Sequence, residues 1–342
     1  MKRTRIGRLC LAAVLLLALC ASAPAYGTGA VAGADSGDFG LKAYEYLCYI
    51  DEKLPDRDSL SGRDTAETRE WIISELKAAG FSESQIRVQD FSFRPDGGKS
   101  RSGRNIIATL PGLSAQQIIV GAHYDGTGAG DNGSGVALLM ETAGRLAKGG
   151  PLPKTLVIIF FDAEEYDMQG SGAYVKAMTK EETTRTAFMV NLDSLICGDY
   201  CYLYGGVPDF DAQAVLETEA FEEVYTLSQR LGLQVQVIPW TFDKPAPGFD
   251  FPGYPSPSTG DWSDHEPFAK RGIQYVYFEA SNWNIPGPDA QYDGDSETEE
   301  YGRIMHTDRD RMDIIDSLFP GRAQAHLQLF SLLLHETLLT FR

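Results

Sequence analysis

The chain has 342 residues, with 48 acidic and 30 basic side chains and a formal net charge of −18 at pH 7. This acidity argues against nucleic acid and anionic membranes as partners. The length is sufficient to bury one large core.

The first 25 residues are predicted to be a cleaved secretory signal. A basic start, MKRTRIGR, precedes the apolar run LCLAAVLLLALCA, and Ala23-Pro24-Ala25 offers small residues at a cleavage position. Residues 26–38 are predicted to be a flexible linker, and residues 39–342 a single domain. No other segment is long and apolar enough for a membrane helix. We therefore expect a secreted or otherwise extracytoplasmic protein.

Strand-like and helix-like segments alternate through this domain. The expected strands cover 105–110, 116–124, 155–161, 186–192, 235–240 and 274–280, and the expected helices lie within 64–81, 134–148, 170–178, 211–231, 264–271 and 322–341. Continuous apolar strands separated by helices are typical of a parallel sheet covered on both faces. The predicted fold class is α/β: a three-layer α/β/α sandwich with a mixed, mostly parallel central sheet.

A loop with six glycines, GAHYDGTGAGDNGSG (121–135), has three interpretations. Residues 128–133 match the dinucleotide fingerprint G-x-G-x-x-G, but residues 123–127 stand between the apolar run and the first glycine, which should follow the strand almost directly. A calcium loop starting at Asp125 fails, because Ala129 and Val136 occupy positions that need oxygen ligands. The third interpretation is a transition-metal site.

Other metal-competent residues support the third interpretation. Three successive strands are followed by a histidine, a glutamate pair and an aspartate, and ligands bind beyond the carboxyl ends of parallel strands. The candidates are His123, Asp131, Glu164, Glu165, Asp193 and His306. Any one of them alone would more often cap a helix or face solvent. Imidazole and carboxylate ligands without thiolates favour a catalytic zinc site.

The segments GAHYD, GDNGSG, DAEEYDMQGS, NLD, SDHEPFAKRGI and HTDRD occur in this order. Together they resemble the secreted zinc aminopeptidases of metallopeptidase family twenty-eight, the bacterial leucyl aminopeptidase type. The resemblance runs from about residue 55 to 340. It implies the zinc-dependent exopeptidase type of fold and two zinc ions per chain. It also implies hydrolysis of the first peptide bond of substrates with a free N-terminus.

The resemblance implies a role for each candidate. Asp131 bridges the two zinc ions, His123 and Asp193 complete one site, and Glu165 and His306 complete the other.

Three further roles follow from the resemblance. Glu164 is the general base for a hydroxide held by both zinc ions. Asp125 holds the imidazole of His123. His265 polarises the scissile carbonyl.

Two alternative functions remain on the same scaffold. A glutaminyl cyclase shares this fold and many of these residues but works with one zinc, and a non-catalytic binding ectodomain should lack ligands or the base. Residues 205–260 match nothing in the family pattern. Aromatic residues that could wall a substrate pocket are therefore open candidates: Phe242, Phe249, Phe251 and Tyr254. The oligomeric state is left open.

Three cysteines follow the predicted signal. The exported context and the short separation predict a disulfide between Cys197 and Cys201. Cys48 lies in an apolar, helical-looking stretch and is expected to be a reduced core thiol. His326 and His335 lie on the last predicted helix and are expected to be structural or solvent-facing.

Overall fold

The structure is a computed structural model that describes residues 38–60, 64–205, 207–209, 214–216, 219–237, 262–285 and 297–341. The predicted signal lies outside the described residues, as do residues 26–37 of the predicted linker and the four aromatic pocket candidates. In the described part of the chain, no helix has the length and apolar character needed to cross a membrane.

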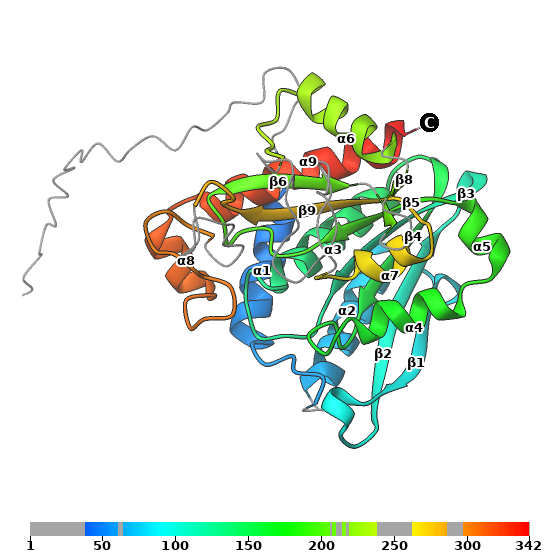
Figure 1. Ribbon diagram of the computed structural model, residues 1–342, viewed down its shortest axis with the longest axis horizontal. Helices are drawn as coiled ribbons and strands as arrows, with labels where there is room; N and C mark the ends of the chain where they lie inside the picture. The colour runs from blue at the N-terminus through cyan, green and yellow to red at the C-terminus, as the bar shows by residue number, and fades with distance from the viewer. Residues whose placement is uncertain are drawn as a thin grey trace, which may run out of the picture. The chain divides into compact units, whose positions relative to one another are not determined.

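A seven-stranded sheet forms the centre of the fold (Figure 1). In spatial order its strands are β1 (Ile86–Phe93), β2 (Arg101–Leu110), β4 (Leu152–Phe161), β3 (Gly112–His123), β5 (Thr186–Leu192), β9 (Tyr275–Ser281) and β6 (Tyr200–Gly205). The four strands from β4 to β9 are parallel, and the outer strands pair antiparallel. A separate small ladder joins β7 (Val207–Asp209) to β8 (Ala214–Leu216). The mixed sheet with a parallel centre confirms the predicted fold class.

Helices cover both faces of the sheet (Figure 1). On one face lie α1 (Leu41–Lys53), α2 (Asp64–Ala79), α3 (Gly133–Ala147), α6 (Glu219–Arg230) and α9 (Arg322–Thr340). On the other lie α4 (Gln169–Ala177) and α7 (His265–Lys270). The remaining short helices are α5 (Lys180–Arg185), α8 (Met312–Leu318) and two 3₁₀ turns, Glu83–Gln85 and Pro95–Gly97.

The apolar core consists of two clusters, one on each face of the sheet. Successive side chains of a strand point to opposite faces, so Ile118 and Val120 of β3 join the first cluster and Ile119 joins the second. A strand buried on both faces needs an unbroken apolar run, which is why the central strands were readily predicted.

Two predicted elements differ from the structure. Helix 211–231 is wrong in its first part, because Ala214–Leu216 form β8 and α6 begins at Glu219. In the predicted strand 235–240, Gln236 makes only an isolated bridge with Tyr202, and residues 238–240 lie outside the described part. Strands β1 and β6 and helices α5 and α8 were not predicted.

Candidate metal centre

The candidate ligands collect at the carboxyl edge of the parallel strands. His123 is the last residue of β3, and Asp193 directly follows β5. Glu164 and Glu165 lie in the turn that connects β4 with α4. The predicted convergence of strand ends at one edge is therefore found in the structure.

Asp131 lies between two histidines from distant parts of the chain. Its Oδ1 is 3.2 Å from His123 Nε2, and its Oδ2 is 2.6 Å from His306 Nε2. Asp193 Oδ1 is 3.3 Å from the same His123 nitrogen, and Glu165 Oε2 is 3.8 Å from His306 Nε2. Two overlapping groups result. We call them the first ligand set (His123, Asp131, Asp193) and the second ligand set (Asp131, Glu165, His306).

The glycine loop (residues 126–131) passes close to buried side chains, which explains its composition. A Cβ on Gly128 would lie 2.0 Å from Asp310 Oδ2, and one on Gly130 would lie 2.1 Å from Cys197 Sγ. Gly126 has a φ of 100°, a conformation that glycine adopts without strain. The glycines therefore serve close packing of the backbone that carries Asp131, not a phosphate cradle.

Asn132 links this loop to both β5 and α3. Its side chain donates to the Leu192 carbonyl at 2.8 Å and accepts the Gly135 amide at 2.9 Å as the N-cap of α3. The ends of β3 and β5 are thus fixed relative to one another at the position where their candidate ligands meet.

Asp125 lies against the turn that carries the paired glutamates. Its carboxylate accepts the backbone amides of Glu164 at 3.1 Å and Glu165 at 3.4 Å. Its Oδ1 is also 3.6 Å from His123 Nδ1, which is longer than a hydrogen bond. The predicted role beside His123 stays a prediction, and the structure adds a role in holding the glutamate turn.

Several site residues have unusual backbone angles. Ala163, just before Glu164, has a φ of 59°, Ser194, just after Asp193, has a φ of 55°, and His306 has a φ of 57°. Non-glycine residues seldom adopt this region, and such strain clusters at functional sites.

Mutual proximity changes the acidity of these groups. Burial lowers the pKa of His123, but Asp193 and Glu164 more than offset burial and raise it well above its ordinary value. Burial raises the pKa of Asp131, but hydrogen bonds from His123 and His306 prevail and hold it below its ordinary range.

The pKa values of the paired glutamates are raised instead. Burial, followed by the charge of Asp264, raises the pKa of Glu164 well above its ordinary value against the opposing effect of His123. Burial and then Asp131 raise the pKa of Glu165 to about 7. An excess of carboxylates over cations at one place accounts for these shifts.

Three residues near the site were missed in the sequence. Asp264 is fully buried, and its charge acts on that of Glu164. Asp310 accepts the amides of Gly130 and Asp131, and the buried Arg57 donates to the Gly128 carbonyl. Asp264 and Asp310 lie inside the motifs SDHEPFAKRGI and HTDRD, which were the available signal. Arg57 had none.

His265 begins α7 and is buried. Its ring packs against Tyr275 and Tyr277, with centroids 4.6 and 5.0 Å away. Its role in polarising the scissile carbonyl stays a prediction.

The predicted Cys197–Cys201 disulfide is wrong. Both thiols are free and buried. Cys197 lies under the glycine loop beside Asp310, and Cys201 is on β6; both belong to the apolar cluster of the α3 face. Cys48 is also free, as expected, but it is half-buried against the core cluster and not inside it.

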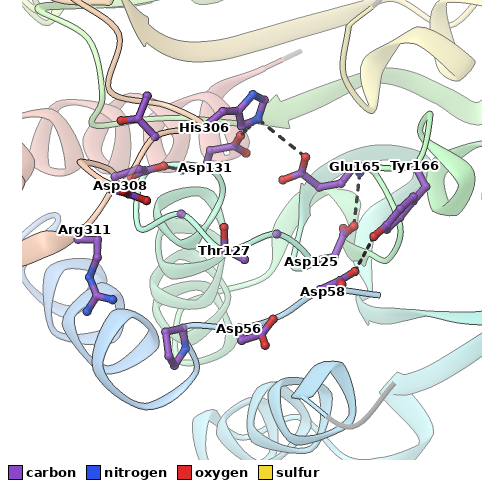
Figure 2. Close-up of a pocket in the computed structure, with 15 residues that line it drawn as sticks. Asp56, Asp58, Asp125, Thr127, Asp131, Glu165, Tyr166, His306, Asp308 and Arg311 are labelled. Carbon is purple, nitrogen blue, oxygen red and sulfur yellow. Dashed lines mark hydrogen bonds and ion pairs between the residues drawn. The ribbon is translucent and has the colours of Figure 1, made fainter. Parts of the chain in front are cut away.

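A cavity of about 660 Å³ opens beside the second ligand set. Figure 2 shows Asp131, Glu165 and His306 grouped at one end of it, with Asp56 and Asp58 farther away. Tyr166 donates to Asp58 at 2.6 Å on one wall, and Asp308 and Arg311 lie on another. The lining is therefore mainly acidic.

The residues fit a bound metal. His123, Asp131 and Glu165 each offer one ligand atom, and these three atoms lie within 4.8 Å of one another. Nitrogen and oxygen donors without thiolate suit catalytic zinc. Divalent cations would also offset the excess carboxylate charge described above.

Comparisons with known proteins point to one family. The model for Peptidase family M28 matches residues 105–330, a range that contains all five candidate ligands. The alkaline phosphatase isozyme conversion protein of Escherichia coli (strain K12) is 29% identical over 244 residues, covering 65% of this chain and 66% of that protein. Aminopeptidase YwaD of Bacillus subtilis (strain 168) is 30% identical over 204 residues, covering 58% of this chain and 36% of that protein. The chain thus spans less than two thirds of the length of either relative.

Two solved structures show the same fold. BSAP, a zinc aminopeptidase from Bacillus subtilis, superposes with a TM-score of 0.66 at 16% identity, covering 90% of this chain and 97% of that chain. A Porphyromonas gingivalis glutaminyl cyclase superposes with a TM-score of 0.63 at 19% identity, covering 89% of this chain and 99% of that chain. At these identities the likeness shows the fold alone.

Proposed function

The chain belongs to peptidase family M28, and from this premise we propose that it is a zinc aminopeptidase acting on peptides with a free N-terminus. The observation that carries the proposal is the position of Asp131, whose two carboxylate oxygens face His123 and His306 separately. Asp193 and Glu165 lie beside the two histidines, so ligands for two metal ions are present. The proposed cofactor is two zinc ions per chain.

The proposed mechanism uses the paired glutamates differently. Zinc, when bound, supplies Lewis acidity that polarises a carbonyl and acidifies water. Glu164 lies beside the first ligand set, with Oε2 4.0 Å from His123 Nε2. It accepts the proton of the attacking water and returns it to the leaving amine. Glu165 belongs to the second ligand set and is a zinc ligand in this proposal.

The acidic cavity is the proposed place for the substrate. A free α-amine is cationic at neutral pH, and carboxylates of Asp131 and Glu165 line the end of the cavity nearest the candidate ligands. An acetylated amine loses this charge-assisted contact and adds bulk. We expect acetylation to reduce kcat/KM by roughly a thousandfold or more.

One assay tests this function against its rivals. The purified protein, loaded with zinc, receives leucyl-p-nitroanilide, the N-acetylated analogue and a peptide with an N-terminal glutamine. We expect release of nitroaniline from the first substrate only and stepwise removal of N-terminal residues from the peptide. The Glu164→Gln variant serves as the inactive control. Release of nitroaniline from the acetylated analogue at a rate similar to that of the free substrate would contradict the proposal.

Glutaminyl cyclase is the second candidate function, because a cyclase superposes over almost its full length. One zinc would need only the second ligand set. In this chain His123 and Asp193 complete the first ligand set as well, which favours the peptidase. Loss of ammonia from the glutaminyl peptide without hydrolysis would favour the cyclase, and no turnover of any substrate would favour a binding protein.

We also propose that the protein is exported. The support is the basic start and apolar run of the first 25 residues, followed by Ala23-Pro24-Ala25. Expression of the full chain in a bacterial host, followed by mass spectrometry, should find a mature N-terminus near residue 26 outside the cytoplasm. An uncut chain that stays in the cytoplasm would overturn this proposal.

A further inference from the structure

The glycine loop is fixed from one side by Arg57, a residue far away in the sequence. The Arg57 backbone amide donates to the Gly126 carbonyl at 3.0 Å, and Nη2 donates to the Gly128 carbonyl at 2.6 Å. Nη1 donates to Leu54, which holds the guanidinium within its own turn. The side chain is only 1% exposed, so a cation lies buried against the carbonyls of the loop.

Asp310 fixes the same loop through its amides. Its carboxylate accepts the amide of Gly130 at 2.5 Å and the amide of Asp131 at 3.0 Å. Its backbone carbonyl accepts the amide of Ala129 at 3.0 Å. Three consecutive amides leading to the bridging aspartate are therefore bound by one residue.

The two side chains also oppose one another in charge. Asp310 favours the charged form of Arg57, and Arg57 favours the charged form of Asp310, although burial opposes both. Both groups are buried. Neutralising one of them leaves the other as a poorly compensated charge away from water, which is costly. The backbone of the loop is thus held between the buried guanidinium of Arg57 and the buried carboxyl group of Asp310.

Asp310 also connects the loop to another candidate ligand. It lies four residues after His306 in a tight turn, where the Asp310 amide donates to Thr307 and the Thr307 amide donates to Ile304. A displacement of Asp310 would therefore move Asp131 through its amide and His306 through the turn. Both belong to the second ligand set.

We propose that Arg57 and Asp310 are positioning residues that determine the zinc affinity of the second ligand set. Neither contacts substrate in this proposal. They act by holding Asp131 where one carboxylate oxygen meets each histidine. The inference rests on the proposed two-zinc site. Partners that orient metal ligands typically contribute roughly 10- to 100-fold to metal affinity.

The test measures zinc affinity, not activity. Metal-free protein is titrated with zinc against a fluorescent chelator, and the two dissociation constants are fitted. The His306→Ala variant shows which constant belongs to the second ligand set. We expect Asp310→Asn to weaken that constant roughly 10- to 100-fold, with a smaller effect on the other site. Arg57→Lys keeps the positive charge but loses the guanidinium group that donates to both Leu54 and Gly128. This variant should weaken zinc binding at the second ligand set less.

Matched substitutions control for nonspecific effects. Asp313→Asn changes a neighbouring exposed carboxylate, and Arg94→Lys changes an exposed guanidinium. Both should leave the two constants unchanged. Thermal unfolding of each metal-free variant reports the stability of the fold separately. If Asp310→Asn does not fold, Arg57→Lys supplies the same measurement.

Three outcomes decide the inference. Selective weakening of the second constant supports it. A lower melting temperature with both constants unchanged would overturn it, because the two residues would then only stabilise the fold. Wild-type protein that binds no zinc would overturn the proposed function and this inference with it.

Discussion

The carboxylate of Asp125 accepts the backbone amide of Glu164 at 3.1 Å. The residue that opens the loop after β3 thus fixes the start of the turn after β4. From this fixed turn the two side chains point to different ligand sets: Glu164 lies beside His123, and Glu165 lies beside His306. Two adjacent residues of the same type are therefore expected to have different roles.

Substitution of the two glutamates should separate these roles. Glu164→Gln should retain both zinc ions and lower kcat by about 10²- to 10⁴-fold, because it removes only the proton acceptor. Glu165→Gln should release zinc from the second ligand set. Elemental analysis and steady-state kinetics on the same samples check both results. The reverse pattern would show that the roles are exchanged.

Metal content should follow the two ligand sets. Active wild-type protein should hold two zinc ions per chain. Asp193→Ala should lower occupancy of one site and His306→Ala of the other, since Asp193 lies beside His123 in the first ligand set and His306 lies beside Asp131 Oδ2 in the second. Elemental analysis after equilibrium dialysis is the measurement. Full activity with a single tightly bound zinc would contradict the two-metal site.

Glu279 should give the metal-free protein a pH-dependent stability. The residue is buried on β9 and accepts hydrogen bonds from the hydroxyls of Tyr204 and Tyr277. Burial raises its pKa from 4.5 to about 8. Between these values the folded state holds a proton that the unfolded state has released. The stabilisation is therefore complete below about pH 4.5 and is lost as the pH rises through 8.

Urea unfolding between pH 5 and 8 measures this effect. The free energy of unfolding should fall with rising pH, by at most about 1.4 kcal/mol per pH unit from this group. Glu279→Gln should remove that contribution to the slope. Identical slopes for variant and wild type would mean that Glu279 titrates normally.

The cysteines give a simple chemical prediction. Protein lacking residues 1–25, unfolded without reductant, should react at three thiols, those of Cys48, Cys197 and Cys201. Burial raises the pKa of the Cys197 and Cys201 thiols well above the ordinary value, so both should react slowly in the folded protein. A single reactive thiol after unfolding would restore the disulfide that the structure excludes.

The central sheet and the candidate ligands could be predicted because each depends on local signals. Buried parallel strands need continuous apolar runs, which are visible in the sequence. In a parallel sheet the carboxyl ends of the strands lie at one edge, so residues that follow the strands meet there. Strand β1 at the sheet edge has no such run, and its exposed Val88 shows why. Residues 214–216 have helical periodicity but pair with β7.

The supporting residues could not be predicted because their roles depend on long-range backbone contacts. Asp310 acts on amides about 180 residues earlier, with sequence separations of 179 and 180. Arg57 acts through carbonyls of the glycine loop, and no side-chain pattern signals such a contact. The predicted disulfide was wrong for a related reason. Separation along the sequence was short, but Cys197 lies before β6 against Gly130 of the glycine loop, Cys201 lies on β6, and both thiols are free.

The order of the ligands along the chain has a consequence for biosynthesis. The first ligand set is complete once residue 193 has been made, but the second needs His306, and Asp310 of the same turn fastens the loop of residues 126–131. A nascent or truncated chain that ends before this turn carries the proposed base and four of the five candidate ligands but lacks the histidine that completes the second ligand set. On the proposed function, hydrolytic capacity is therefore acquired only in the final stage of synthesis, so unfinished chains would not cleave the peptides around them.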